Sequence, residues 1–236
     1  MNKDFLEKCL KDINVEYNQD IVNDLLAYMS RVLNVNQNMN LTSIKDEKDF
    51  IIKNIIDSLI LTKYIPNNSK IIDIGTGAGF PGSVLKLYDR TLDFTFVDSV
   101  AKKLNFVKEA LVEMDVANID FSSQRAEELS RNSAYRERYD ICVSRAVASL
   151  PILCELCIPF IKVGGYFIAQ KSRGLSDELK LLGNGYKKLG CVLEKVDSDK
   201  LPFDDYERNT VLFKKVKQTD NLYPRRYAQI RKMPIK

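Results

Sequence analysis

The sequence contains no histidine among its 236 residues. Histidine supplies the base of Ser-His and Cys-His nucleophilic systems, and it is the commonest ligand of transition metals in proteins. Its absence excludes those catalytic systems and most transition-metal chemistry. Any reaction that this protein catalyses must proceed without an imidazole, and we expect no metal site.

Cysteine is scarce. There are five: Cys9, Cys142, Cys154, Cys157 and Cys191. An odd number does not suggest a disulfide framework, so a reducing cytoplasm is the expected compartment. The CxxC spacing of Cys154 and Cys157 is typical of zinc and redox sites, but no second pair exists to complete a zinc site. Because Leu153 and Leu156 flank the pair, we expect a buried helix face, with a thioredoxin-type role as the alternative.

Long apolar runs are also missing. No run reaches the roughly 18–20 residues that a membrane-spanning helix needs. The first residues, MNKDFLEKCLKD, are charged and lack the apolar core of a signal peptide. We therefore expect a cytoplasmic protein with no membrane partner.

Charge of both signs is abundant but unevenly distributed. The formal net charge is +4, whereas residues 213–236 contain eight basic side chains and one acidic side chain. This segment therefore carries +7, and the rest of the chain about −3. A basic tail on a slightly acidic body favours a polyanionic partner, and a merely solubilising tail is the alternative.

Hydrophobic periodicity changes near residue 65. Residues 1–65 have apolar side chains at helical spacing, with a third helix expected over 46–63. After Lys70, short apolar runs alternate with helical segments, which predicts a parallel sheet with helices on both faces. The expected strands are 70–75, 92–99, 117–124, 139–146, 164–171, 191–198 and 209–216. The last two have no helix between them, which predicts an antiparallel edge pair. We expect an α/β fold with a seven-stranded, mostly parallel sheet in residues 66–236 and a helical extension in residues 1–65.

The segment IIDIGTGAGFPG, residues 71–82, contains four of the ten glycines. A strand that ends in glycine turns and enters a helix marks the crevice where doubly wound sheets bind ligands. Glycine permits positive φ and a close approach of the ligand to the backbone. The spacing G-x-G-x-G differs from the G-x-G-x-x-G of pyrophosphate binders, and no P-loop lysine follows.

Two acidic residues accompany this loop. Asp73 precedes the glycines, and a carboxylate at the mouth of the site would repel pyrophosphate but suit an ammonium group. Asp98 ends the second strand, 21 residues after Gly77, where an acid accepts hydrogen bonds from ribose hydroxyls. The two acids and the open loop fit S-adenosylmethionine. A purely structural strand–turn–helix is the alternative.

Motifs spread over nearly the whole chain carry a family resemblance. They are NLTSIKD, DSL at 57–59, DIGTGAGFPG, FVDSVAKKLNFV, RAEEL, YDICVSRAVASL, GGYFIAQK and YPRRYAQIRKMPI. In this order and spacing the sequence resembles the RsmG family, also called GidB. The resemblance implies a Rossmann-like class I methyltransferase that depends on S-adenosylmethionine. It also implies a bacterial enzyme that methylates N7 of one guanine in 16S rRNA of the small (30S) ribosomal subunit.

The resemblance also implies a set of cofactor contacts: Gly75, Phe80, Asp98, Ser99, Ala126, Glu127 and Arg145. The reading of the residues themselves agrees for Gly75 and Asp98 and adds Asp73 and Gly77. Phe80 packs either on the cofactor or in the core beside the following helix. Arg145 is the candidate for positioning at the active-site mouth, with a plain salt bridge at a strand end as the alternative.

Methylation at guanine N7 suits a chain without histidine. N7 has a lone pair and no proton, so it attacks the sulfonium methyl group without a general base, and catalysis comes mainly from alignment. Cytosine C5 methylation would need a cysteine nucleophile, but Cys142 lies in an alternating strand and is expected to be a buried structural thiol. Methylation of exocyclic amines commonly uses an Asn/Asp-Pro-Pro-aromatic motif after strand 4, where this chain has SRAVASLP.

RNA contacts are expected at Lys171, past the fifth strand, and at Arg225 and Arg226 in the basic tail. The alternative is a tail that packs on the body and only stabilises the fold. Two other functions remain open at this point: a small-molecule methyltransferase, and a non-catalytic RNA-binding protein on the same fold. A monomer is expected.

Overall fold

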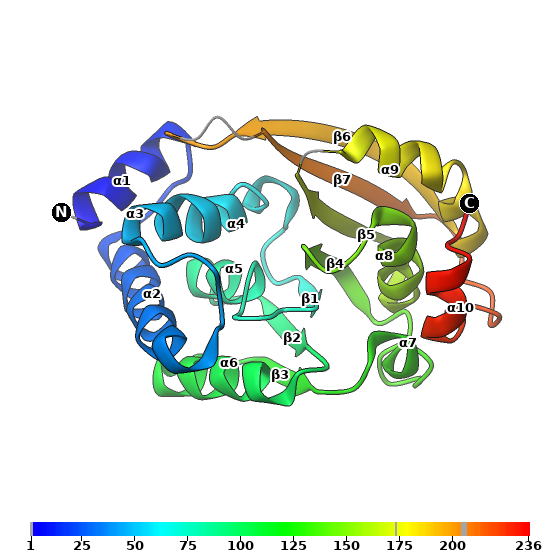
Figure 1. The fold of residues 1–236 in the computed structure, drawn as a ribbon, viewed down its shortest axis with the longest axis horizontal. Helices are drawn as coiled ribbons and strands as arrows, with labels where there is room; N and C mark the ends of the chain where they lie inside the picture. The colour runs from blue at the N-terminus through cyan, green and yellow to red at the C-terminus, as the bar shows by residue number, and fades with distance from the viewer. Residues whose placement is uncertain (1, 173, 204–206) are drawn as a thin grey trace.

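A seven-stranded sheet runs through the molecule, with helices on both of its faces (Figure 1). The computed structural model describes residues 2–172, 174–203 and 207–236. The strand order is β3-β2-β1-β4-β5-β7-β6. The strands are β1 (Lys70–Ile74), β2 (Asp93–Val97), β3 (Ile119–Ser122), β4 (Tyr139–Arg145), β5 (Ile161–Lys171), β6 (Cys191–Lys200) and β7 (Glu207–Lys215).

The strand directions confirm the predicted α/β class. β3, β2, β1, β4 and β5 pair in parallel, whereas β7 is antiparallel to both β5 and β6. The predicted antiparallel edge pair is therefore present. The chain builds the sheet outward from β1 to β3 and then crosses to β4 on the other side of β1. The resulting switch point lies between β1 and β4, where folds of this kind bind ligands.

Two apolar clusters pack on opposite faces of the sheet. Ile71 belongs to the cluster covered by α1 to α6, and the next residue, Ile72, belongs to the cluster of α7 to α10, because successive strand residues point to opposite faces. The helices are α1 (Asn2–Asp12), α2 (Gln19–Met39), α3 (Glu47–Phe50), α4 (Asp57–Leu59), α5 (Gly82–Tyr88), α6 (Ala101–Glu113), α7 (Ala126–Leu129), α8 (Leu150–Cys157), α9 (Leu175–Leu182) and α10 (Tyr227–Lys232). Shorter helical segments are η1 (Ile51–Ile56), η2 (Thr62–Tyr64), η3 (Ile158–Phe160) and η4 (Gly185–Leu189).

The third helix expected over 46–63 is present, but it is not a regular α-helix. It begins as α3, winds as a π-helix through η1, and returns to α-helical geometry in α4. A π-helical turn inside an α-helix is rare and frequently marks a functional site. Here the irregular turn ends at Asp57, whose side chain is only 4% exposed.

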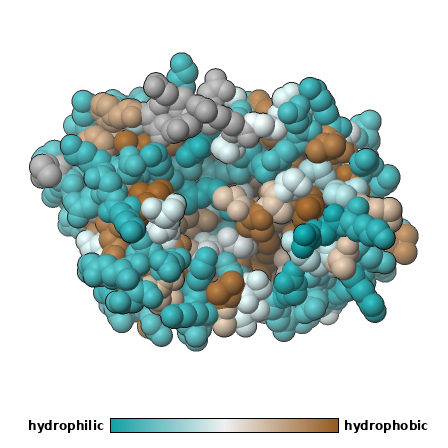
Figure 2. All heavy atoms as spheres, viewed as in Figure 1, coloured by the Kyte–Doolittle hydropathy of each residue, from teal (hydrophilic) through white to brown (hydrophobic). Residues whose placement is uncertain are grey.

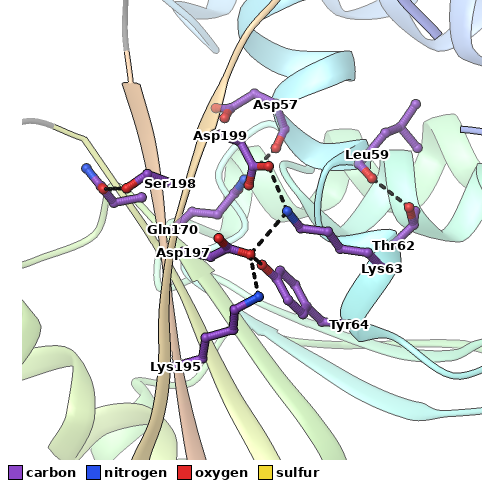
Figure 3. Close-up of polar contacts among 11 residues, drawn as sticks. Asp57, Leu59, Thr62, Lys63, Tyr64, Gln170, Lys195, Asp197, Ser198 and Asp199 are labelled. Atoms are coloured by element: carbon purple, nitrogen blue, oxygen red, sulfur yellow. Dashed lines mark hydrogen bonds and ion pairs between the residues drawn. The ribbon is translucent and has the colours of Figure 1, made fainter. Parts of the chain in front are cut away.

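The segment after this helix is tied to the edge of the sheet by a cluster of polar contacts (Figure 3). Lys63 Nζ lies 2.7 Å from Asp199 Oδ1, and the Tyr64 hydroxyl donates to Asp197, both on β6. Lys195 Nζ lies 2.8 Å from the same Asp197 carboxylate. These hydrogen bonds from Lys195 and Tyr64 hold the pKa of Asp197 well below its usual range. The N-terminal helices thus contact the sheet both through a shared apolar cluster and at β6. The boundary at residue 65 between a helical extension and a methyltransferase domain stays a prediction.

The cysteines are reduced and buried. Cys154 and Cys157 lie on α8 with no exposed surface, which confirms the predicted buried helix face. Cys142 lies in β4, where burial raises the pKa of its thiol well above the usual value.

Across the described ranges, no helix is long and apolar enough to cross a membrane, and no three His, Cys, Asp or Glu side chains are grouped to hold a metal ion.

The basic C-terminal segment packs on α8, and part of its charge is internal. Lys215 has no exposed surface; its Nζ lies 3.1 Å from the carbonyl oxygen of Ile158 and 3.1 Å from Glu137 Oε1. Arg225 forms three hydrogen bonds with the fully buried carboxylate of Glu155: two from its side chain, at 2.9 Å from Nε and 2.6 Å from Nη2, and one from its backbone N–H at 2.8 Å. The charge of this segment, which the sequence suggested was directed at a polyanion, is thus partly used to hold the segment in place.

We expect Arg225→Ala to lower the free energy of unfolding by about 3–5 kcal/mol, because it leaves the buried Glu155 carboxylate without its charged partner and with only the backbone N–H of residue 225 as a donor from this segment. The matched control is Arg226→Ala, which removes an exposed cation and should change stability by about 0.5 kcal/mol or less. Urea unfolding of both variants measures the difference. Equal stability of the two variants would contradict a structural role for Arg225.

Candidate functional site

A cavity of about 590 Å³ lies at the carboxyl ends of β1, β2 and β4, where the strand order reverses. Its volume is in the range of small-molecule and cofactor sites. In the same view as Figure 1, the surface is hollowed near its centre, with apolar and neutral residues in the hollow and hydrophilic residues around it (Figure 2). Eight of the nine predicted cofactor residues line the cavity: Gly75, Gly77, Phe80, Asp98, Ser99, Ala126, Glu127 and Arg145.

The glycine loop forms the floor of this cavity. Gly77 has φ +57°, and a Cβ atom built on it would have no atom closer than Gly75 O at 4.0 Å. The side of Gly77 that lacks a side chain is therefore open. Tyr28 of α2 supports the loop from below, because its hydroxyl donates to the carbonyl oxygen of Ala78 at 2.9 Å. A helix of the N-terminal segment thus fixes the conformation of the loop.

Asp98 forms a hydrogen bond with the same loop. Its Oδ2 accepts a hydrogen bond from Gly77 N at 2.8 Å, and its Oδ1 accepts one from Val100 N at 2.8 Å. A carboxylate has about four acceptor positions, so about two remain for further donors. The location fits the predicted contact with ribose hydroxyls, which stays a prediction. The structure adds a second role, the ordering of the glycine loop.

Asp73 is not at the mouth of the cavity, which corrects the expectation from the sequence. Its side chain is fully buried, and its Oδ2 accepts a hydrogen bond from Gly82 N at 3.0 Å. The reason lies in the strand alternation: Asp73 points to the same face as Ile71, and α5 covers that face. Burial raises the pKa of Asp73 to about 7. The carboxyl group therefore supports the start of α5 and does not line the cavity.

Arg145, at the end of β4, donates hydrogen bonds to three residues in the π-helix and directly after it. Nη1 donates to the carbonyl oxygen of Lys53 and to Asp57 Oδ2, both at 3.0 Å. Nη2 donates to Asn54 Oδ1 at 2.9 Å. Asp57 Oδ1 accepts in turn from Arg208 Nε at 3.0 Å. Burial lowers the pKa of Arg145, and the neighbouring Asp57 carboxylate opposes this shift. Arg145 does form the salt bridge considered as its alternative role, and it also lines the cavity.

Phe80 occupies the core position that was one of the two alternatives for it, and it also lines the cavity. Its ring packs edge to face against Tyr28 and Phe50, at centroid distances of 6.0 and 5.5 Å, and is largely buried. The guanidinium of Arg145 lies 5.3 Å from the ring centroid. Phe80 is therefore a core residue that also supports the Arg145 side chain; contact with the cofactor stays a prediction.

The far wall of the cavity is formed by the turn after β3 and by α10. Ser99 is exposed, and Ala126 begins α7. The Glu127 carboxylate accepts from Arg125 Nε at 2.7 Å, and the Arg125 guanidinium lies 4.5 Å from the ring centroid of Tyr227. Ala126 and Glu127 thus lie beside the cavity, and their predicted contact with the cofactor stays a prediction.

A second cavity, of about 550 Å³, adjoins the first. The two share Thr42, Asn54, Arg145 and Ala146. Lys171, the last residue of β5, lines the second cavity. Its Nζ is paired with Glu178 at 2.7 Å and donates to Ala148 O at 2.9 Å, so it does not present an unpaired positive charge to RNA.

Sequence reasoning missed several residues of this site. Asn54, Asp57, Gln170 and Arg208 line the second cavity, and Tyr28 supports the loop. A signal for the first two was present: both are polar residues within the otherwise apolar run IIKNIIDSLI. Arg208 gave no such signal, because only the antiparallel placement of β7 brings it to the site.

Two solved structures share the fold. One is a precorrin-6y C5,15-methyltransferase from Geobacter metallireducens, with a TM-score of 0.51 and 13% identity over 67% of this chain and 87% of that chain. The other is an S-adenosylmethionine-dependent O-methyltransferase from Thermotoga maritima, with a TM-score of 0.51 and 16% identity over 80% and 73% of the two chains. The fold, the glycine loop and the cavity at the switch point, together with the family match below, define an S-adenosylmethionine-dependent methyltransferase.

Within this class, the chain belongs to the family of rRNA small subunit methyltransferase G (GidB), whose family model matches residues 21–207. The ribosomal RNA small subunit methyltransferase G of Alkaliphilus oremlandii is 43% identical, over 99% of each chain. That of Alkaliphilus metalliredigens is 39% identical, over 100% of this chain and 99% of the relative. The resemblance noted in the sequence is thereby confirmed.

We expect Gly77→Val to lower affinity for S-adenosylmethionine by roughly tenfold or more, equivalent to about 1.4 kcal/mol, because the new side chain enters the open side of the loop. The control is Gly164→Val in β5, which also has positive φ and an open Cβ position but lies outside the cavity. Both variants should lose some stability through backbone strain. Calorimetric affinities that fall equally in both variants, or in neither, would contradict the assignment of the cavity.

The pKa of Asp73 predicts a pH-dependent contribution to stability. Its pKa rises from 3.8 to about 7 on folding, so the folded state binds the proton more tightly than the unfolded state. The resulting stabilisation is complete below about pH 4 and is lost as the pH rises to 7, to the extent of about 4 kcal/mol. Asp73→Asn should lack this dependence. The measurement is chemical unfolding of parent and variant from pH 4 to 8, and parallel curves would refute the prediction.

Proposed function

We propose that this protein transfers the methyl group of S-adenosylmethionine to N7 of one guanine in the 16S rRNA of the small ribosomal subunit. Its membership of the rRNA small subunit methyltransferase G family supports an rRNA substrate. We further propose that it acts as a monomer in the cytoplasm. The choice of N7 rests on the chemistry of the second cavity.

The observation that carries the proposal is the pairing of the acids in that cavity. Both oxygens of Asp57 accept from arginines, one from Arg145 and one from Arg208. Glu178 is paired with Lys171 and also accepts from Leu150 N at 2.6 Å. Among the described residues that line the second cavity, no carboxylate lacks an ion pair and none is a cysteine. The cavity therefore offers neither a ready general base nor a thiol nucleophile.

This environment suits a nucleophile that has no proton to lose. A ribose hydroxyl or an exocyclic amine must give up a proton when it is methylated, whereas N7 of guanine attacks with a free lone pair. When bound, S-adenosylmethionine supplies a methyl group activated by its sulfonium charge. The protein's contribution is then mainly alignment of the two reactants. Arg145 is a positioning residue in this scheme, because its contacts with Asp57 and Asn54 fix the wall between the two cavities.

Two exposed or partly exposed cations near the cavity support a surface for RNA contact. Arg226 is exposed at the start of α10, beside Tyr227, which lines the cofactor cavity. Lys103 lines the same cavity from α6. These two cations are placed to contact phosphates near the opening, whereas Arg225 and Lys171 are occupied by ion pairs. Phosphate contacts would supply affinity, and the cavity would supply selectivity for an unstacked base.

The test is incubation with labelled S-adenosylmethionine and small subunits that lack the modification, followed by mapping of the methylated base. We expect one 16S guanine to carry the label at N7. Cys142→Ala should transfer methyl groups at a rate comparable to the parent, because its thiol is buried and protonated. Label at another atom, or a folded Cys142→Ala protein that binds cofactor and RNA but transfers no methyl group, would refute direct attack by N7.

Cofactor binding without transfer to any RNA would favour a small-molecule methyltransferase. RNA binding without cofactor affinity would favour a non-catalytic protein on the same fold. The transfer assay, together with measurements of cofactor and RNA binding, therefore distinguishes the three functions that the sequence left open.

A further inference from the structure

The wall of the second cavity contains one unsatisfied donor and one unsatisfied acceptor. Among the residues that the structure describes, neither Asn54 Nδ2 nor Gln170 Oε1 has a hydrogen-bond partner. Both residues line this cavity, and each is only 4% exposed. Buried polar groups in folded proteins are nearly always paired, so two unpaired groups in one cavity call for an explanation. The two atoms themselves have almost no accessible surface, so they lie just behind the cavity wall. A bound molecule with the complementary groups, admitted by a small shift of the neighbouring side chains, would provide the explanation.

The orientation of both amides is determined by their other contacts. Asn54 Oδ1 accepts from Arg145 Nη2 at 2.9 Å, and a guanidinium has only donors, so the remaining group of Asn54 is the NH₂. Gln170 Nε2 donates to the carbonyl oxygen of Asp57 (Figure 3), which only accepts, so the remaining group of Gln170 is the oxygen. Rotating either amide by 180° would place two donors or two acceptors against each other.

The two groups also have a defined order along the cavities. Asn54 lines both the cofactor cavity and the second cavity, whereas Gln170 lines only the second. A planar molecule that reaches from the second cavity toward the methyl group therefore passes the Asn54 donor nearer the cofactor and the Gln170 acceptor farther away.

Guanine presents the complementary groups in this order. Around the edge of the ring, N7 is followed by the O6 acceptor and then by the N1–H donor. With N7 directed at the cofactor cavity, O6 lies on the side of Asn54 Nδ2 and N1–H on the side of Gln170 Oε1. Adenine reverses both groups, because it carries an amino group in place of O6 and a bare N1. An adenine in this position would leave two buried polar groups of the protein facing groups of the same kind.

We propose that Asn54 and Gln170 determine the base specificity of this site by binding O6 and N1–H of the target guanine. The inference rests on the proposed function and extends it from the reaction to the choice of base. A site built to hydrogen-bond its substrate discriminates strongly against an analogue that cannot form those bonds, because the protein groups are then left unpaired.

The discriminating variants are Asn54→Asp and Gln170→Met. The first substitution keeps the oxygen that accepts from Arg145 but replaces the donor by an acceptor, while the second keeps the approximate shape of the side chain and removes the acceptor. The matched controls are Asn38→Asp and Gln37→Met, which make the same changes at exposed positions of α2 outside both cavities. Affinity for S-adenosylmethionine and the melting temperature are measured for all four.

The substrates are small subunits reconstituted with ligated 16S rRNA that carries guanine, inosine or 2,6-diaminopurine at the target position. All three bases keep N7; inosine keeps O6 and N1–H, whereas 2,6-diaminopurine reverses both. The parent should methylate guanine and inosine and discriminate against 2,6-diaminopurine. Each site variant should lower kcat/KM for guanine by about 10- to 100-fold, with cofactor affinity and melting temperature like those of the controls. The ratio of kcat/KM for guanine to kcat/KM for 2,6-diaminopurine should fall in both site variants, and most in Asn54→Asp.

Two results would overturn the inference while leaving the proposed function intact: guanine methylation by both site variants at the rate of the controls, or an unchanged preference for guanine over 2,6-diaminopurine. The second result would assign the two amides to a structural role or to a bound water. A parent protein that methylates no guanine in the subunit would instead overturn the proposed function, and the inference with it.

Discussion

The carboxylate of Asp57 is the contact on which the rest of the site depends. It joins three parts of the chain that are distant in sequence: the π-helical segment that precedes it, Arg145 at the end of β4, and Arg208 on β7. Its side chain is only 4% exposed, so each arginine compensates a charge that burial alone would make costly. Because Arg145 also binds Asn54 and lies over Phe80, this one ion-pair network sets the wall between the two cavities. The irregular helix places the carbonyl oxygen of Lys53 and the Asp57 side chain beside the same guanidinium.

The sheet and the position of its ligand cavity could be predicted from the sequence, because both depend on local patterns. The apolar run of β1, the glycines after it and Asp98 at the end of β2 lie where their spacing indicated. The predicted position of Asp73 at the mouth of the cavity was wrong, and the alternation of side chains along β1 explains why. Asp73 lies two residues after the buried Ile71 on one strand, so its side chain points under α5 and away from the mouth of the cavity.

What the sequence did not predict depends on contacts between distant segments. The sequence predicted an antiparallel pair at the edge of the sheet, but nothing near Arg208 indicates that β7, the later of the two strands, lies beside β5. The β5–β7 pairing brings Arg208 to Asp57. Likewise, a count of basic residues cannot show that Arg225 is paired with Glu155, since the partner is on α8, 70 residues earlier. The basic composition of the C-terminal segment predicted a polyanionic partner, and rRNA, the substrate in the name of this family, is a polyanion. Composition alone could not distinguish cations that face solvent from cations that form ion pairs within the fold.

The construction of the cofactor cavity has a consequence for the order of events during synthesis. Its wall includes Leu41, which precedes the sheet, and Tyr227, which follows the last strand. A chain still attached to the ribosome has the glycine loop and Asp98 long before residue 227 leaves the exit tunnel. Until then, the side of the cavity that Tyr227 lines is open. Segments on both sides of the sheet in the sequence must therefore be folded before the wall of the cavity is complete.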